Sequence, residues 1–151
     1  MALPDDLLSR LCRRDLSTRI AVLDDAFRPR QYGDWLDTAR DLTHVVRTLS
    51  ERGYTVLPVN PWEEAVEGLP TVDNPSALEG PIHLAVFLSD PDISLGMMEL
   101  LEHADCVWFQ PGASDDDLIE EAQDRFGLVG IGDICAAVAE VKYTLPWSEP
   151  A

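Results

Sequence analysis

Hydrophobic residues concentrate in five short runs along the chain. The runs cover residues 19–23, 54–60, 82–88, 105–109 and 128–131. Each is bounded by acidic residues, Pro or Gly, and each has the length of a β-strand. The segments between them have either helical spacing of apolar residues or the composition of a loop.

The segment after the first run has the clearest helical period. Its apolar residues recur at intervals of three and four, which places them on one face of a helix. Asp34 is the expected N-cap and Gly53 the glycine that ends the helix. The residues on this face are Trp35, Ala39, Leu42, Val46 and Leu49.

Helices are also expected after the third, fourth and fifth runs. The first begins within 89–92, and the second is capped by Ser114 and stops at Gly127. The third covers 134–143. In the first of these helices the expected inward residues are Ile93, Met97, Leu100 and Leu101. The Pro-rich stretch 61–81 reads as loop, with a short strand near 69–72 and one helical turn after Asn74.

Alternating strands and helices predict an α/β fold, a doubly wound parallel sheet of five or six strands with a Rossmann-like topology. The length of 151 residues suits one domain covering 1–151. Residues 1–18 form an N-terminal helical extension in this interpretation, with Leu7 and Leu11 on its apolar face.

Charge is distributed unevenly. Residues 1–53 carry nine Arg and nine acidic residues, whereas 54–151 carry two basic and nineteen acidic residues, which accounts for the net charge of −17. This balance disfavours nucleic acid and anionic membrane surfaces as partners. A homodimer, if one forms, should therefore use the neutral N-terminal third, with Leu7 and Leu11 as its apolar patch.

The chain shows no membrane span and no signal peptide, and its three cysteines are too few for a disulfide framework. We therefore expect a cytoplasmic protein with reduced thiols. No Ser occupies a nucleophile elbow, and no His/Cys/Asp cluster has metal-ligand spacing. The sequence therefore offers no hydrolase triad and no metal site.

Three motifs stand at the carboxyl ends of predicted strands, where ligands bind in doubly wound sheets. Residues 54–61 read Tyr-Thr-Val-Leu-Pro-Val-Asn-Pro, residues 107–112 read Val-Trp-Phe-Gln-Pro-Gly, and residues 132–135 read Gly-Asp-Ile-Cys. Together they resemble the small coenzyme A-binding domain proteins, single-domain relatives of the N-terminal domain of the succinyl-CoA ligase α-subunit. The resemblance covers roughly 19–143.

This resemblance implies a module that binds coenzyme A or another small nucleotide without catalysis. Two arginines and a tyrosine in the loop after the first strand would supply charge and stacking, and the motifs supply the remaining contacts. The candidate cofactor-binding residues are Arg28, Arg30, Tyr32, Pro58, Val59, Asn60, Phe87, Gln110, Gly112 and Cys135.

The sequence departs from the family at the phosphate loop. The family has a glycine-and-serine loop after its first strand, whereas residues 22–27 contain no glycine and include Asp24-Asp25. Glycine would allow backbone N–H groups to approach a pyrophosphate, and two carboxylates would repel one. An alternative function is therefore an interaction or scaffold protein that keeps the fold and has lost the ligand. A regulatory subunit of an acyl-CoA ligase is a third possibility.

Several candidates also have structural explanations. Arg28, Arg30 and Arg40 could bind phosphate or pair with neighbouring acidic residues. Asn60 could bind a ribose or adenine edge, or form an Asx turn. Cys135, at a predicted helix N-terminus, is either a thiol of lowered pKa or a buried structural residue. Asp24-Asp25 fits neither a receiver domain, which needs a suitably placed Lys, nor a phosphatase of the Asp-x-Asp type.

Overall fold

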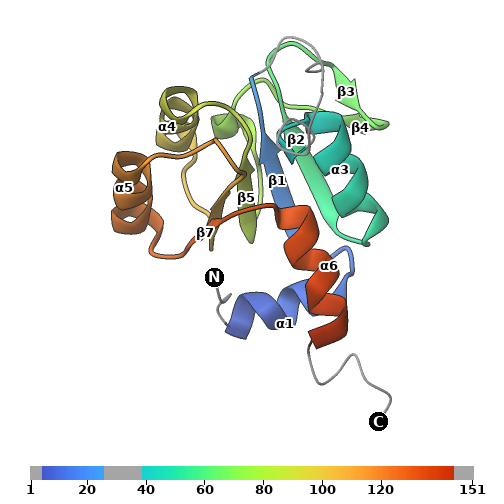
Figure 1. The fold of residues 1–151 in the computed structure, drawn as a ribbon. Coiled ribbons are helices and arrows are strands. Elements are labelled where there is room, and N and C mark those ends of the chain that lie inside the picture. Colours follow the sequence, from blue (N-terminus) through green and yellow to red (C-terminus); the bar gives the residue numbers. More distant parts are fainter. Residues whose placement is uncertain (1–4, 26–38, 145–151) are drawn as a thin grey trace.

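A five-stranded parallel sheet forms the centre of the computed structural model, which describes residues 5–25 and 39–144 (Figure 1). The strand order is β2-β1-β5-β6-β7, and all four pairings are parallel. The predicted α/β doubly wound fold is therefore confirmed. The strands are β1 (Arg19–Leu23), β2 (Thr55–Val59), β5 (Leu84–Phe87), β6 (Val107–Phe109) and β7 (Val129–Ile131).

Helices cover both faces of the sheet (Figure 1). One face packs against α3 and α6, with α1 beside α6, and the other against α4 and α5. Successive residues of a strand point to opposite faces, so Val22 and Val86 belong to the first core and Ala21 and Phe87 to the second. The helices are α1 (Asp5–Arg13), α3 (Leu42–Glu51), α4 (Pro91–Leu100), α5 (Asp116–Phe126) and α6 (Ile134–Thr144).

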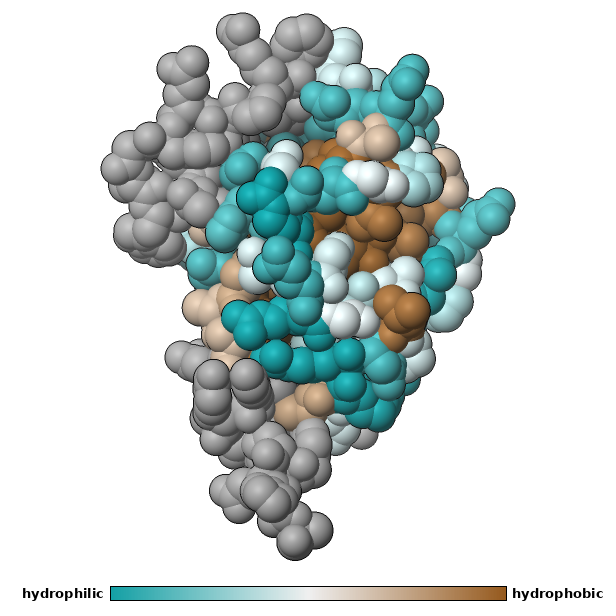
Figure 2. All heavy atoms as spheres, turned by 90° about the vertical axis from the view of Figure 1, so that its right-hand side faces the viewer, coloured by the Kyte–Doolittle hydropathy of each residue, from teal (hydrophilic) through white to brown (hydrophobic). Residues whose placement is uncertain are grey.

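The segment between β2 and β5 contains more structure than the sequence indicated. The predicted short strand and helical turn are confirmed as β4 (Leu69–Pro70) and the 3₁₀ turn η1 (Pro75–Ala77), and β4 pairs with an unpredicted strand, β3 (Ala65–Val66). Val72 then extends the outer edge of β2, because it exchanges backbone hydrogen bonds with residues 58 and 60. On the side that carries α3 and this hairpin, hydrophilic residues surround a hydrophobic area (Figure 2).

Helix starts are the least well predicted feature. The expected N-cap Asp34 lies outside the described residues, and the described helix α3 begins at Leu42 after Asp41. The N-cap of α5 is Asp115 rather than Ser114, because the Asp115 carboxylate accepts the N–H of Leu118 at 2.8 Å. A carboxylate at this position also complements the helix dipole.

The predicted inward face of α4 is partly wrong. Met97 and Leu101 are buried, but Ile93 is 38% and Leu100 50% exposed. Ser94 takes the inward position instead, and its hydroxyl donates a hydrogen bond of 2.8 Å to the carbonyl of Ser89. This bond satisfies a buried polar group that the apolar pattern assigned to solvent.

The N-terminal helix α1 is held by the body of the protein. Leu11 is fully buried, and the Tyr54 hydroxyl donates to its carbonyl at 2.6 Å. Burial raises the pKa of Tyr54 to about 12. The prediction that Leu11 forms part of an exposed apolar patch is therefore wrong, because its side chain is fully buried. The side chain of Leu7 lies outside the described part of the chain. Dimer formation through the N-terminal third stays a prediction.

No helix in the described ranges is long and apolar enough to cross a membrane.

Two glycines should respond to alanine in opposite directions. Gly53 has φ of +106°, and a Cβ there would lie 2.1 Å from the Arg14 carbonyl oxygen, whereas Gly96 in α4 has no neighbouring atom within 4 Å of such a Cβ. Gly53→Ala should lower the free energy of unfolding by more than ~1 kcal/mol, and Gly96→Ala should raise it by about 0.5–1 kcal/mol. Urea denaturation measures both. Equal effects would show that backbone conformation does not distinguish these sites.

Candidate functional site

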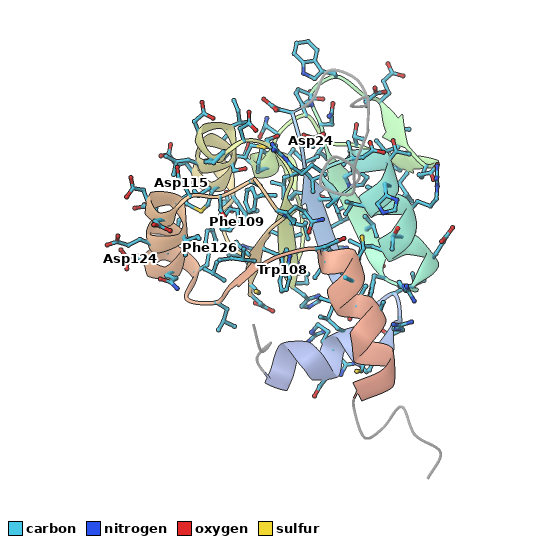
Figure 3. The ribbon with its side chains drawn as sticks, in the orientation of Figure 1. Asp24, Trp108, Phe109, Asp115, Asp124 and Phe126 are labelled. Carbon is cyan, nitrogen blue, oxygen red and sulfur yellow. The ribbon has the colours of Figure 1, made fainter. Side chains whose placement is uncertain are left out.

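The candidate site is the crevice at the carboxyl ends of the strands. The strand order reverses between β1 and β5, since β1 is followed in the chain by β2 on one side and then by β5 on the other. Ligands of doubly wound proteins bind outside this switch point. Asp24 stands at this end of β1 (Figure 3).

Two carboxylates and one hydroxyl occupy the switch point. Asp24 and Ser89 are both almost completely buried. The Ser89 Oγ lies 3.0 Å from Asp24 Oδ1 and 2.9 Å from Asp25 Oδ1, and it accepts the backbone N–H of Asp25 at 3.1 Å. Its hydroxyl proton can be donated to only one of the two carboxylates at a time, and Ser89 therefore lies between two acidic side chains at the position where the resemblance implies a phosphate loop.

The loop after β2 presents an aromatic ring. The side-chain oxygen of Asn60 accepts the backbone N–H of Trp62 at 2.7 Å and that of Glu63 at 3.1 Å, so Asn60 forms the Asx turn. The Trp62 indole N–H donates to the Asp25 carbonyl at 2.9 Å. The Trp62 residue is 58% exposed, and this bond fixes it at the crevice.

Arg40 places a positive charge at the crevice. Its Nε donates to the carbonyl of Leu88 at 2.7 Å, and its Nη2 lies 2.6 Å from Asp90 Oδ1. The arginine side chain is 12% exposed and the aspartate side chain 68%, so water screens the pair and it contributes about 0–1 kcal/mol. Gly112, with φ of +86°, passes close to this guanidinium, because a Cβ there would lie 3.1 Å from Nη1.

Gln110 is a structural clamp. It is fully buried, its amide nitrogen donates to the carbonyl of Ala39 at 2.6 Å, and its amide oxygen accepts the backbone N–H of Ile134 at 2.9 Å. The side chain thereby joins β6, the segment before α3 and the N-terminus of α6. Its hydrogen-bonding groups serve the fold rather than facing the crevice.

Cys135 is not an activated thiol. Burial, reinforced by the negative charge of Asp133, raises its pKa to about 12. Of the two alternatives, the structure supports the buried structural residue, because desolvation of the thiolate outweighs the effect of the helix dipole. Burial also raises the pKa of Cys106 to about 11.

The structure divides the predicted site residues into three groups. Arg28, Arg30 and Tyr32 lie outside the described residues. Pro58, Val59 and Phe87 are buried at the strand ends, and the Phe87 ring stacks on Phe109 with centroids 5.3 Å apart. Asn60, Gln110, Gly112 and Cys135 lie around the crevice with the contacts given above. Their roles as ligand contacts stay predictions.

Sequence reasoning missed two residues of the crevice. Trp62 directly follows the Asn-Pro of the first motif, and its position beside that motif was the available signal. Ser89 was read only as part of a helix start, and nothing local in the sequence indicates that it pairs with a carboxylate 65 residues away.

The described part of the crevice disfavours a diphosphate at the switch point. Asp24, Asp25 and Asp90 place carboxylates around the switch point, and Arg40 already contacts one of them. Within the described ranges, no group of three or more His, Cys, Asp or Glu side chains could hold a metal ion that would offset this charge. We therefore derive no diphosphate contact at Asp24 and Asp25.

Removal of the Gln110 amide should destabilise the protein. Gln110→Met keeps much of the volume but leaves the Ile134 N–H and the Ala39 carbonyl without this partner, which costs about 1–3 kcal/mol. Gln123→Met, on the exposed face of α5, should change stability by less than about 0.5 kcal/mol. Thermal and urea denaturation measure both, and equal stability of the two variants would refute the clamp.

A family model described as a CoA binding domain matches residues 32–140. The matched region begins after β1, so Asp24, Asp25, Arg28 and Arg30 lie outside it. Tyr32 is its first residue.

Relatives come from bacteria and archaea. An uncharacterized protein of Bacillus subtilis, YneT, is 28% identical over 126 residues, which cover 82% of this chain and 85% of that protein. A hypothetical protein of solved structure from Pyrococcus horikoshii OT3 aligns with a TM-score of 0.71 at 22% identity, covering 92% of each chain. A solved structure from Thermus thermophilus aligns with a TM-score of 0.62 at 26% identity, over 91% of this chain and 97% of that one.

The family match, which spans more than half of the sequence, leads to one assignment. The chain belongs to the CoA binding domain family.

Proposed function

We propose that the protein is a non-catalytic module that binds coenzyme A or a related nucleotide through its base. Membership of the CoA binding domain family supports a ligand of this class. The observation that carries the base-directed mode is Trp62, whose ring is exposed and fixed by its hydrogen bond to the Asp25 carbonyl.

A rigid exposed indole suits a planar ligand. Stacking of a nucleobase on an aromatic side chain contributes about 1–3 kcal/mol. The Asx turn of Asn60 and the indole hydrogen bond fix the ring before a ligand arrives, so little side-chain entropy is lost on binding.

The ligand's phosphates need a different position from the family's phosphate loop. Arg40 is a nearby cation, and its partner Asp90 is exposed enough for an anion to replace it. Arg28 and Arg30 are further candidates by sequence. Charge-assisted hydrogen bonds from such arginines suit phosphate oxygens.

Three features support a role without catalysis. The raised pKa of Cys135 keeps its thiol protonated near neutral pH. His83 lies at the amino ends of the strands, on the opposite side of the sheet from the crevice. There its Nδ1 accepts the backbone N–H of Arg19 at 2.9 Å, and burial lowers the pKa of its imidazole. Ser89 is bonded to carboxylates, which makes it a structural partner of Asp24 and Asp25.

Coenzyme A should stabilise the protein, and the effect should depend on Trp62. Ligand at about 100 times its dissociation constant adds about 2.7 kcal/mol, or roughly 5–10 °C in melting temperature for a chain of this size. Trp62→Ala should weaken binding by about tenfold, and Trp62→Phe by less. Calorimetry with coenzyme A, adenosine and pantetheine identifies the part that binds.

Leu16→Ala is the control for loss of an exposed hydrophobic side chain away from the crevice, and it should leave affinity unchanged. Binding by pantetheine but not by adenosine would contradict the base-directed mode. The absence of any thermal shift at millimolar coenzyme A would contradict the ligand class.

A second candidate function is an interaction or scaffold protein that keeps the fold and has lost the ligand. The Asp24–Ser89–Asp25 cluster favours it, because carboxylates take the place where backbone N–H groups would bind phosphate. In this case the crevice carries no nucleotide in the cell, and native mass spectrometry of the purified protein finds none.

Removal of one crevice carboxylate separates the two functions. Asp25→Asn should raise coenzyme A affinity by about fivefold if phosphates bind within a few ångströms, since a unit charge at 4 Å contributes about 1 kcal/mol in water. Asp105→Asn removes one negative charge at the amino ends of the strands, away from the crevice, and should change the affinity for coenzyme A little. Calorimetry compares the two variants. No binding in either variant or in the wild type would support the scaffold.

A further inference from the structure

A groove runs between α4 and α5, on the face of the molecule away from α3 and α6. Its volume is about 480 Å³. The two helices lie side by side along the sheet, and Asp115 marks the start of α5 beside α4 (Figure 3). The lining residues are Pro91, Asp92, Leu95, Glu99, Asp115, Asp117, Leu118 and Glu121.

The groove has an apolar floor. Leu118 is only 3% exposed and packs in the core beneath, whereas Pro91 and Leu95 are partly exposed within the groove. Such a floor gives a partner apolar surface to bury, which the hydrophobic effect rewards at about 25 cal/mol per Å².

The rims of the groove are uniformly acidic. Five of the eight lining residues are Asp or Glu, and among these described lining residues none is basic. Arg125 lies at the far end, where its guanidinium donates to the carbonyl of Glu99 at 3.0 Å and stacks over Phe126. It therefore ties α5 to the end of α4 rather than neutralising the middle of the groove.

Like charges this close reinforce one another. The Debye length is about 8 Å at physiological salt, so the potentials of carboxylates on facing helices add within the groove. A concave surface of one sign attracts molecules of the opposite sign. The apolar floor offers no ligand to a free small cation, so a partner with both apolar and basic side chains suits the groove better.

Gly96 follows the lining residue Leu95 in α4. It lies on the exposed part of α4 between Asp92 and Glu99, and an added Cβ would meet no atom within 4 Å. Glycine inside a helix costs about 0.5–1 kcal/mol relative to alanine, and no contact within the described structure requires it. The α4 backbone is therefore uncovered at this exposed position, beside the residues that line the groove.

We propose that the α4–α5 groove is a docking site for a partner protein, specifically for a basic amphipathic segment whose apolar side chains contact Leu95 and Leu118 and whose Lys or Arg side chains face the acidic rims. The argument is charge complementarity combined with a shaped apolar floor. None of the groove's lining residues belongs to the crevice cluster of Asp24, Asp25 and Ser89, so binding at the two places can be measured separately.

The probe is a fluorescein-labelled synthetic helical peptide with Leu on one face and Lys on the other, compared with a Glu/Leu peptide of the same length. The full-length protein should bind the Lys/Leu peptide in an anisotropy titration and should not bind the Glu/Leu peptide. In a ¹⁵N-labelled sample, the perturbed amide signals should lie within 91–99 and 115–121.

Matched double variants separate the groove from general acidity. Glu99→Gln with Glu121→Gln should weaken peptide binding by about tenfold, because it removes two rim charges. Glu102→Gln with Glu120→Gln removes two exposed charges nearby that do not line the groove, and it should weaken binding by less than about twofold. Leu95→Ala should also weaken binding, because it removes part of the floor.

Three results would overturn the proposal. Equal losses in the two double variants would show attraction to net charge alone. Perturbed amides spread over the whole surface would show that the groove is not the site. A self-association in light scattering that the groove variants abolish would show that a second copy, not a basic partner, occupies it.

Discussion

Burial of the Asp24 carboxylate at the switch point is the constraint on which much of the structure depends. A buried charge is costly unless it is hydrogen-bonded, and the Ser89 hydroxyl supplies a bond at 3.0 Å. The carbonyl of Ser89 in turn accepts the hydroxyl of Ser94 in α4. Ser94 lies on the inward face of α4, whereas Ile93 and Leu100 are exposed, so Ser89 links the crevice to this face of the helix.

In a glycine-rich phosphate loop, an open ligand-binding position and an affinity for phosphate occur together, whereas here the buried carboxylate separates them. The fold retains the open carboxyl edge where ligands bind, while the charge at its centre disfavours phosphate. Trp62 and Arg40 lie at the margins of this centre and offer stacking and positive charge there. A ligand would therefore contact the rim of the crevice more than its middle.

Fold and strand positions could be predicted because they depend on local patterns. The core strands carry uninterrupted apolar runs, and residues such as Val22 and Phe87 are buried although they point to opposite faces of the sheet. Gly53 ends its helix as expected, because its positive φ is a property of the local backbone.

The candidate site was harder to predict because it depends on distant pairings. Ser89 meets Asp24, Gln110 meets both Ala39 and Ile134, and Arg40 meets Asp90. None of these pairs is close in sequence, so the spacing of residues along the chain does not predict them. Cys135 shows a second reason: its helix position suggested a lowered pKa, but the degree of burial that raises it depends on tertiary packing.

The packing of α1 against α6 has a consequence for how the chain acquires its fold. These helices are the first and last of the described elements, and α1 also receives the Tyr54 hydrogen bond at Leu11. During synthesis, β1, β2 and β5 emerge long before α6. One face of the sheet therefore stays incompletely covered until α6 has been made. Contacts between such distant segments slow folding, because the intervening chain must be ordered first. Completion of this fold is thus tied to the emergence of α6 from the ribosome.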